Sequence, residues 1–572
     1  MAKNTISYTS LSTPFEPEVG KLPFFEYPRP TMRRNSYFSL NGIWRLSVAL
    51  KNKELYCGDV LVPFVPESKM SGVCQRFPSG CRLQYSRSFV LPTDFIVDRV
   101  IINFGAADRY TVVRVNGITV CENDGGYLPF SADITDALFE GENRIDVECI
   151  DDLDLDYPYG KQCKKRGGMW YTPISGIWQS VWLESVCKNY IQGLFIKSDM
   201  RSVTVRVVGG ASHKKMTLLD GAEKNEYNFY GEEITVHIPN GVHWTPDTPY
   251  LYKFKLTSGD DCVESYFALR EFSIEKKGKS PAILLNRKPV FLHGVLDQGY
   301  FSDGIYLPAT VEGYKSDILT MKKLGFNTLR KHIKIEPELF YYYCDKYGML
   351  VCQDMVNSGK YSFLLDTALP TIGFKRGIRR SASRKRKHIF EDTARCTLEL
   401  LGNHPSVVYY TIFNEGWGQY DADRLYEELK LVDKTRIYDT TSGWFHGEKS
   451  DVESMHVYFK PFRVKKEYSR PLVLSEFGGY SYKINEHSFN VGKTYGYKLF
   501  DNKKDFEDAL VRLYLNEIVP AIDKGLCGAF LTQLSDVEDE TNGLLTYDRQ
   551  RLKIDEDIMK KISEDIYSKI KT

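Results

Sequence analysis

The second half of the chain alternates strand-like and helix-like segments, and this alternation constrains the fold more than any other feature. After residue 281, short runs rich in β-branched and aromatic residues recur at 289–295, 326–332, 349–355, 407–415, 437–444, 454–459, 471–477 and 528–534. Eight strands that alternate with helices over about 290 residues are typical of a (β/α)8 barrel. We therefore predict that residues 281–572 form a C-terminal TIM barrel.

Helical segments connect most of these strands. Three of them begin with acidic residues and stop at Gly325, Gly348 and Gly402, which are the expected helix boundaries. The connections after the fifth and sixth strands show no clear helical pattern, so we assign no helix to them.

The first half of the chain has a different texture. Residues 1–185 contain short β-rich runs such as FSLNGIWRLSV, YTVVRVNGITV and IWQSVWLE, separated by Gly, Asn, Asp and Pro. Strands at this spacing without helices between them indicate a sandwich or a barrel. Residues 186–280 continue with alternating strands, and their length suits an immunoglobulin-like β-sandwich. We predict three domains in this order.

Charge and composition narrow the class of protein. The net charge of +1 implies no general attraction to nucleic acid or to acidic membranes. No apolar run approaches the roughly 18–20 residues of a membrane span, and the N-terminus lacks the apolar core of a secretory signal. The 12 cysteines are scattered without a CxxC pair, as expected for free thiols in a reducing compartment. We expect a cytoplasmic protein with no membrane or nucleic-acid partner.

Two strand-like runs of the predicted barrel end on a glutamate. VVYYTIFNE places Glu415 at the end of the fourth strand, and PLVLSEF places Glu476 at the end of the seventh. The active site of a TIM barrel lies at the carboxyl ends of its strands, and strands 4 and 7 stand on opposite sides of the mouth. Two carboxyl groups facing each other at about 5–5.5 Å are what retaining glycoside hydrolysis uses. One must be protonated near neutral pH and the other ionised.

Polar side chains near other strand ends surround this predicted pair. Any single one would be an ordinary rim residue, but nearly every strand contributes one. The set comprises His293, Arg330, His332, Asp354, Asn357, Trp444, His456, Tyr458, Gln533 and Asp536. Together they indicate a substrate site at one rim of the barrel.

Several motifs resemble those of glycoside hydrolase family 2, which includes β-galactosidases, β-glucuronidases and β-mannosidases. LNGIWRLSV, NFGAADRYTVVRVNG, GENRIDVECID and SGIWQSVWLE follow one another in the order of that family's jelly-roll domain. NHPSVVYYTIFNEGWGQ, LSEFGG and TQLSDVEDETNGLLTYDR resemble its barrel. The resemblance implies a β jelly-roll sandwich over residues 1–185, ahead of the two domains predicted above.

The resemblance also implies individual roles. Glu415 would be the acid/base and Glu476 the nucleophile. Asn414 would hydrogen-bond the 2-hydroxyl of the sugar, and Tyr458 would orient the nucleophile. The substrate-binding set would be completed by His332, Asp354, Asn357, Trp444 and His456.

Neither a cofactor nor a metal is expected. The segment QDMVNSG follows the third strand, where large β-galactosidases carry a Glu-containing metal motif. No HExxH, Cys/His cluster or phosphate-binding glycine loop occurs in the chain. A homo-oligomer is expected by family analogy alone.

These observations predict a retaining exo-β-glycosidase, with β-galactosidase as the first specificity. β-Glucuronidase and β-mannosidase are the alternatives within the family. Asn502-Lys503-Lys504 fits the Asn-x-Lys pattern of β-glucuronidases, although such short patterns arise by chance. From a different class, a catalytically silent carbohydrate-binding protein would lack one of the two glutamates, and neither is missing. A glycosylated small molecule is a further possible substrate, with a lid-like loop at 361–388.

Two further features keep open interpretations. The segment FKRGIRRSASRKRKH at 374–388 holds eight Lys and Arg residues, which indicates either a solvated loop or a surface for an anionic substrate or an acidic partner. The predicted jelly-roll domain either binds sugar itself or supports the barrel and lends it a loop. Trp170 and Trp178 fit either a binding role or a core position.

Overall fold

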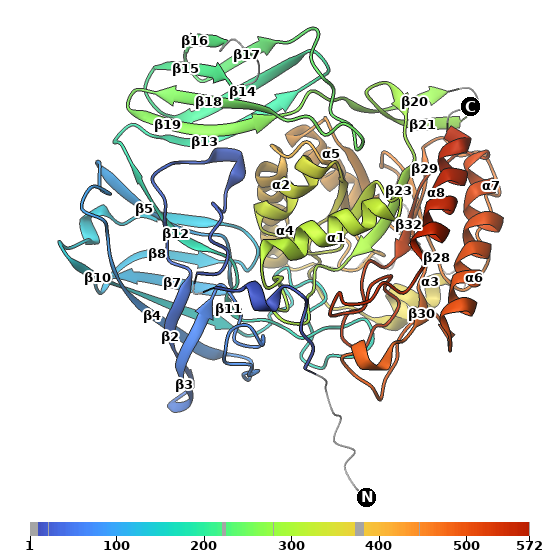
Figure 1. Ribbon diagram of the computed structural model, residues 1–572, viewed down its shortest axis with the longest axis horizontal. Coiled ribbons are helices and arrows are strands. Elements are labelled where there is room, and N and C mark those ends of the chain that lie inside the picture. Colours follow the sequence, from blue (N-terminus) through green and yellow to red (C-terminus); the bar gives the residue numbers. More distant parts are fainter. Residues whose placement is uncertain are drawn as a thin grey trace, which may run out of the picture.

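The computed structural model describes residues 10–20, 22–219, 225–277, 280–371, 382–445 and 447–570. Two β-rich units lie beside a larger barrel that carries most of the helices (Figure 1). The first unit is drawn in blue and cyan, the second in green, and the helices of the barrel run from yellow-green to red. No helix within the described ranges is long and apolar enough to cross a membrane.

The first unit is a sandwich of two antiparallel sheets. Along β2 (Gly42–Leu50), Trp44 and Leu46 are buried and the residues between them are exposed, the alternation of a strand with one face on a core. The six-stranded sheet has the order β3-β2-β4-β10-β7-β8, and the four-stranded sheet the order β1-β12-β5-β9. The other strands are β1 (Phe38–Ser39), β3 (Lys53–Val62), β4 (Cys81–Val90), β5 (Arg99–Phe104), β7 (Tyr110–Val115), β8 (Ile118–Asp124), β9 (Phe130–Asp133), β10 (Glu142–Asp151) and β12 (Val181–Val186), with a separate pair β6 (Ala107–Asp108) and β11 (Gly176–Ile177).

The second unit is a smaller sandwich. One sheet has the order β13-β14-β17 and the other the order β16-β15-β18-β19. Their strands are β13 (Ile191–Ser198), β14 (Ser202–Gly209), β15 (His213–Leu218), β16 (Glu226–Tyr230), β17 (Glu233–His237), β18 (Tyr252–Ser258) and β19 (Asp261–Phe267). A three-stranded sheet then leads into the barrel through β20 (Phe272–Lys277), β21 (Ser280–Leu285) and β22 (Lys288–Pro289).

The eight predicted barrel strands are confirmed. They form one parallel sheet of order β27-β26-β25-β24-β23-β32-β29-β28, whose two end strands β27 and β28 come into contact and nearly close the barrel. The strands are β23 (Leu292–Asp297), β24 (Thr328–Lys331), β25 (Leu350–Asp354), β26 (Val407–Phe413), β27 (Ile437–Thr441), β28 (Glu453–Val457), β29 (Leu472–Gly478) and β32 (Leu526–Thr532). β30 (Tyr480–Tyr482) and β31 (Lys498–Phe500) pair outside the barrel.

Helices surround the barrel where the sequence predicted them. Gly348 follows α2 with φ at 72°, a left-handed conformation that glycine adopts without strain. Among the described residues, the connections after β27 and β28 contain no helix, as the sequence indicated. The helices are α1 (Val311–Lys323), α2 (Glu338–Tyr347), α3 (Leu369–Thr371), α4 (Arg384–Leu401), α5 (Ala422–Val432), α6 (Lys503–Leu513), α7 (Val519–Ile522) and α8 (Glu556–Ile570), with π-helical turns at Phe363–Ala368 and Tyr514–Ile518.

One predicted rim residue lies elsewhere. His293 is the second residue of β23 and therefore sits at the amino end of its strand, away from the mouth of the barrel. Its Nδ1 lies 3.1 Å from the carbonyl of Gly325, and its ring packs against Phe326 and Tyr514. The strand begins three residues later than the sequence indicated, because β22 takes Lys288 and Pro289 into the preceding sheet.

Candidate active site

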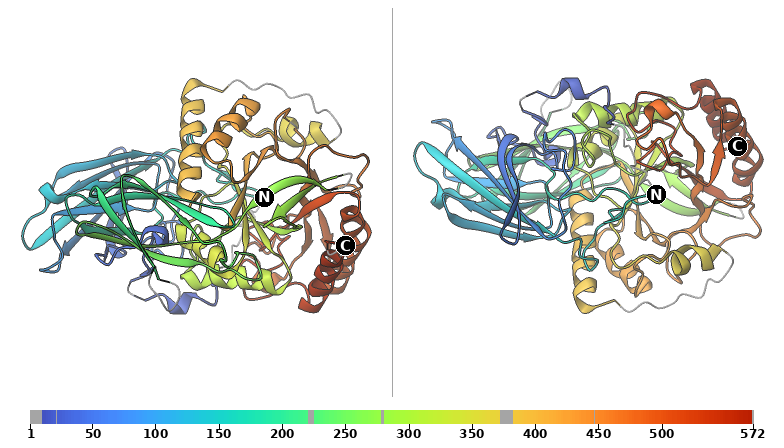
Figure 2. Two further views of the ribbon diagram at one scale, coloured as in Figure 1. Left: turned by 90° about the horizontal axis from the view of Figure 1, so that it is seen from above. Right: turned by 90° about the horizontal axis from the view of Figure 1, so that it is seen from below.

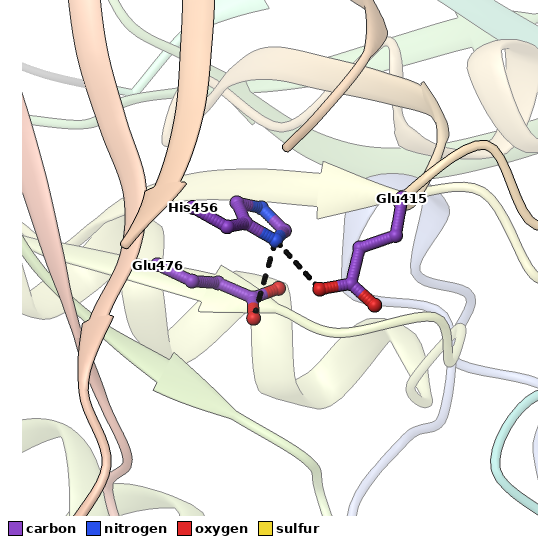
Figure 3. A group of neighbouring side chains, drawn as sticks. All are labelled: Glu415, His456 and Glu476. Carbon is purple, nitrogen blue, oxygen red and sulfur yellow. Dashed lines mark hydrogen bonds and ion pairs between the residues drawn. The ribbon is translucent and has the colours of Figure 1, made fainter. Parts of the chain in front are cut away.

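The two strand-end glutamates face each other at the mouth of the barrel. Glu415 follows β26 and Glu476 lies within β29. One oxygen of each carboxyl group and a ring nitrogen of His456 all lie within 4.8 Å of one another (Figure 3). Glu415 has φ at 54°, a left-handed conformation that is rare outside glycine, and its amide donates to the carbonyl of Ser442 at 3.1 Å. The strained backbone turns the side chain of Glu415 out of the strand.

Glu476 is surrounded by donors. Arg330 Nη1 donates to its Oε1 at 2.9 Å, and the hydroxyl of Tyr458 donates to its Oε2 at 2.5 Å. Burial by itself would raise the pKa of Glu476, but the charges of His456 and Arg330 and the hydrogen bond from Tyr458 lower this pKa to about 2. Glu476 is therefore ionised at neutral pH, as a nucleophile must be.

Glu415 has the opposite electrostatic environment. Burial raises the pKa of Glu415, and the nearby charge of Glu476 raises it further, against the effect of a hydrogen bond from His456. The Nδ1 of His456 lies 2.8 Å from Glu415 Oε1, and Arg330 Nη1 lies 3.4 Å from its Nε2. Because Arg330 can only donate, Nε2 accepts and Nδ1 carries the hydrogen that meets Glu415. The two carboxyl groups are thus tuned apart.

Arg330 connects the opposite sides of the site from the base of the mouth. It extends from β24 and is 1% exposed. Its guanidinium donates to Asp354 Oδ1 at 3.0 Å, to Asn414 Oδ1 at 2.9 Å and to Glu476. The sequence placed Arg330 at the rim but gave no sign that it joins three neighbouring strands.

Asn414 presents its amide nitrogen toward the mouth. Its Oδ1 accepts from Arg330 and from Ser442 Oγ, the latter at 2.9 Å. A substrate hydroxyl beside Asn414 would therefore meet the donors of its NH2 group. On the neighbouring strands, His332 Nδ1 and Asp354 Oδ2 are 2.8 Å apart, and burial lowers the pKa of His332 so that the ring stays neutral.

The remaining predicted residues occupy different positions. Trp444 is half-buried and its ring lies 5.7 Å from that of His456, beside the carboxyl pair. Asn357 is buried, and its Nδ2 donates to the carbonyl of Trp417 at 3.0 Å. Asp536 is held by Lys553 at 2.6 Å in the closing segment, where it supports the loop. Substrate contacts by Trp444 and Asn357 stay predictions.

A loop of the first unit completes the mouth. Residues 152–175 run from the first sandwich to the barrel, where Tyr171 donates to Glu540 and the amide of Thr172 donates to Glu538 at 2.9 Å. A Cβ on Gly160 (φ 63°) would lie 2.8 Å from the carbonyl of Ile333, so only glycine permits this close approach. The loop brings Lys161 close enough to Glu415 for its charge to lower the pKa of that carboxyl, although burial dominates. The sequence did not identify Lys161, since no motif marks it.

The carboxyl pair and His456 form the only group of the described residues with metal-ligand spacing. Arg330 and Tyr458 already donate to both oxygens of Glu476, which leaves that carboxylate poorly available to a cation. The donor set fits proton transfer and nucleophilic attack better than metal binding.

Two family models match the chain. The model described as "Glycosyl hydrolases family 2, TIM barrel domain" matches residues 276–562, half of the chain, and the one described as "Glycosyl hydrolases family 2, sugar binding domain" matches residues 69–186. The chain belongs to glycosyl hydrolase family 2. Both matched regions contribute to the mouth, the barrel through its strand ends and the sugar-binding region through residues 152–175.

The relatives have different specificities. A β-galactosidase of Priestia megaterium is 24% identical over 460 residues, covering 73% of this chain and 42% of that protein. A β-glucuronidase of Rattus norvegicus is 24% identical over 463 residues, covering 69% of this chain and 68% of that protein. The solved structure of a β-D-glucuronidase of Dictyoglomus thermophilum has a TM-score of 0.74 at 20% identity and covers 94% of this chain and 98% of that one. The chain thus spans about two fifths of the β-galactosidase it matches.

Two sequence patterns are accounted for differently. Asn502 caps α6, with its Oδ1 accepting from the amide of Asp505 at 2.9 Å and its Nδ2 donating to Asp505 Oδ2 at 2.8 Å. The Asn-x-Lys pattern is therefore a helix start. Of the basic segment 374–388, residues 374–381 lie outside the described residues. In its described part, Lys385 pairs with Asp154 of the first unit at 2.9 Å.

Proposed function

We propose that the chain is a retaining exo-β-glycosidase in which Glu476 is the nucleophile and Glu415 the acid/base. The observation that carries this proposal is the pair of strand-end carboxyl groups, close together and with pKa values shifted in opposite directions. That spacing suits a covalent intermediate, since an inverting pair stands about 6.5–9.5 Å apart to admit a water molecule.

The reaction proceeds in two displacements. Glu476 attacks the anomeric carbon while Glu415 gives its proton to the glycosidic oxygen, and the leaving group departs as an alcohol. Glu415, now ionised, takes a proton from water, which attacks the anomeric carbon and releases Glu476. The amide nitrogen of Asn414 is placed to bind the 2-hydroxyl, and His332 with Asp354 to bind other hydroxyls.

For the sugar, we propose β-galactose first, with β-glucuronate and β-mannose as alternatives. The fully engaged carboxamide of Asn502 favours this order, because the one Asn-x-Lys pattern that fitted a glucuronidase begins a helix.

A panel of nitrophenyl α- and β-glycosides of these sugars tests the proposal. We expect one β-glycoside to turn over and Glu476→Gln to reduce its kcat/KM by at least about a thousandfold, since the nucleophile is lost. Turnover of α-glycosides alone would contradict the assigned roles. A sugar-binding protein without activity would show saturable binding and no hydrolysis of any glycoside in the panel.

A further inference from the structure

The surroundings of Glu415 define where a leaving group departs. An acid/base must face the glycosidic oxygen, so the side chains beside Glu415 line the space that the leaving group occupies. Trp417 lies two residues further on, and its amide donates to the carbonyl of Asn414 at 2.9 Å. Aromatic residues from three separate segments gather around this turn.

Two half-buried rings stand on a buried one. The ring of Trp170 lies 5.0 Å from that of Tyr361 and 5.2 Å from that of Trp417, in edge-to-face arrangements. Trp417 is 2% exposed and its Nε1 donates to the carbonyl of Gly359 at 2.9 Å, which fixes it as a support. Trp170 and Tyr361 keep part of their surface exposed. Two rings held rigidly in this way suit the binding of a flat partner.

A third ring joins this pair from the loop after β29. A Cβ on Gly168 would lie 3.4 Å from the ring of Tyr495, so the loop of the first unit packs directly against it. Burial raises the pKa of both Tyr361 and Tyr495, and the carboxyl of Glu415 is near enough to raise both further. The rings of Tyr361 and Tyr495 therefore flank the acid/base.

Lys161 lies at the edge of these rings. Its ammonium is 5.6 Å from the ring centre of Trp170, and its charge lowers the pKa of the buried Glu540. In the part of the chain that the structure describes, no acceptor lies within hydrogen-bond distance of Lys161 Nζ. A ligand oxygen at this position would find a free donor.

We propose that Trp170, Tyr361 and Tyr495, with Lys161 at their edge, form a leaving-group subsite for a planar aromatic aglycone bearing an oxygen or carboxylate substituent. The substrates would then be β-glycosides of phenolic compounds. The inference rests on the proposed function, and it assigns a substrate contact to the loop at residues 152–175 of the sugar-binding region.

Binding of non-hydrolysed analogues tests the subsite without relying on catalysis. Phenyl and cyclohexyl β-thioglycosides of the sugar chosen by the nitrophenyl panel, or of galactose if none is chosen, are titrated calorimetrically into the native chain. We expect the phenyl compound to bind about tenfold more tightly, because only a flat ring stacks on Trp170 and Tyr361. Equal affinities would overturn the aromatic assignment.

Variants localise the effect. Trp170→Ala and Tyr361→Ala should each remove most of the phenyl preference, whereas Trp170→Phe should retain part of it. Phe139→Ala, at a 62% exposed ring of the first sandwich, serves as the matched control and should leave the preference unchanged. A phenyl preference that survives both alanine variants would place the ring elsewhere and overturn the subsite.

Lys161 is tested with a second ligand pair. The 4-carboxyphenyl thioglycoside should bind more tightly than the phenyl compound, by about fivefold, and Lys161→Met should abolish this difference while Lys161→Arg retains it. No difference in the native chain would remove Lys161 from the subsite. Hydrolysis of the panel without any phenyl preference would sink the subsite alone, and a phenyl preference without hydrolysis would sink the proposed function alone.

Discussion

At the scale of single residues, Arg330 determines the arrangement of the site. It is buried with Asp354 and Glu476, two carboxylates whose charges its guanidinium compensates. Arg330→Met keeps the length of the side chain but leaves both carboxylates without their cation. We expect the free energy of unfolding to fall by about 3–5 kcal/mol, measured by denaturant titration.

Arg45→Met is the matched control for this change. Arg45 pairs with Asp59 on the surface, where their side chains are 56% and 68% exposed, and we expect a change within about 0.5 kcal/mol. Equal stability of the Arg330 variant and the native chain would show that the buried charges do not depend on the guanidinium.

The pH profile reports the two carboxyl groups. Activity requires Glu476 ionised and Glu415 protonated, so kcat/KM rises as pH increases through the pKa of Glu476, about 2, and falls as pH increases through the raised pKa of Glu415. Tyr458→Phe removes a donor to the ionised form of Glu476, so its pKa rises. We expect the acidic limb to move to higher pH in this variant, and an unmoved limb would exclude the hydrogen bond as its cause.

The acid/base is tested by the leaving group. Glu415→Gln cannot give a proton to the glycosidic oxygen, so kcat/KM should fall by about 10²–10⁴ for a poor leaving group such as methanol. Dinitrophenolate departs without protonation, and its glycoside should lose far less. The kcat/KM values of both glycosides with the same sugar provide the comparison. An equal loss for both would contradict the role of Glu415 as acid.

The sequence was sufficient for the two glutamates and insufficient for their partners. Glu415 and Glu476 each end an apolar run, and a barrel brings strand ends together, so their proximity follows from the pattern. The role of Arg330 depends on which strands stand beside β24 and on the side-chain rotamer, and neither is encoded in local periodicity. Lys161 comes from a loop about 250 residues away in sequence, without a spacing rule to link it to Glu415.

At the scale of elements, the loop at residues 152–175 is held to the barrel by a few buried polar contacts. Tyr171→Phe removes a donor to the buried carboxyl of Glu540, and Asn542 Nδ2, at 3.0 Å, remains. We expect a loss of about 1–3 kcal/mol in the free energy of unfolding and a higher KM, because the loop carries part of the mouth.

Tyr110→Phe is the control for the loop variant. Its hydroxyl donates to Glu122 at 2.8 Å on the surface, so its loss should be within about 0.5 kcal/mol. A Tyr171→Phe variant with native stability and native KM would show that the loop is held by other contacts.

Elements were predictable where the period was clear. The eight barrel strands and the helices ending near Gly325, Gly348 and Gly402 follow from apolar runs and helix-stop residues. The position of His293 was wrong because a continuous apolar run does not show where one sheet ends and the next begins.

At the scale of the whole molecule, the three parts of the chain support one another. The second sandwich is joined to the barrel by Tyr266, whose hydroxyl donates to the buried Asp345 at 2.8 Å, and by Arg270, whose Nε donates to the carbonyl of Pro405 at 2.7 Å. Figure 2 shows from two sides that both β-rich units lie against the same side of the barrel. The domain limits at residues 185 and 280, the oligomeric state and the cytoplasmic location stay predictions from the sequence.

The most direct test of the central claim is to trap the covalent intermediate. The native chain is incubated with an activated 2-deoxy-2-fluoro β-glycoside of the preferred sugar, digested, and analysed by mass spectrometry. We predict one added fluoro-sugar on the peptide that contains Glu476, and none in Glu476→Gln. A sugar attached to Glu415, or hydrolysis with inverted anomeric configuration and no covalent adduct, would contradict the assignment of Glu476 as the nucleophile.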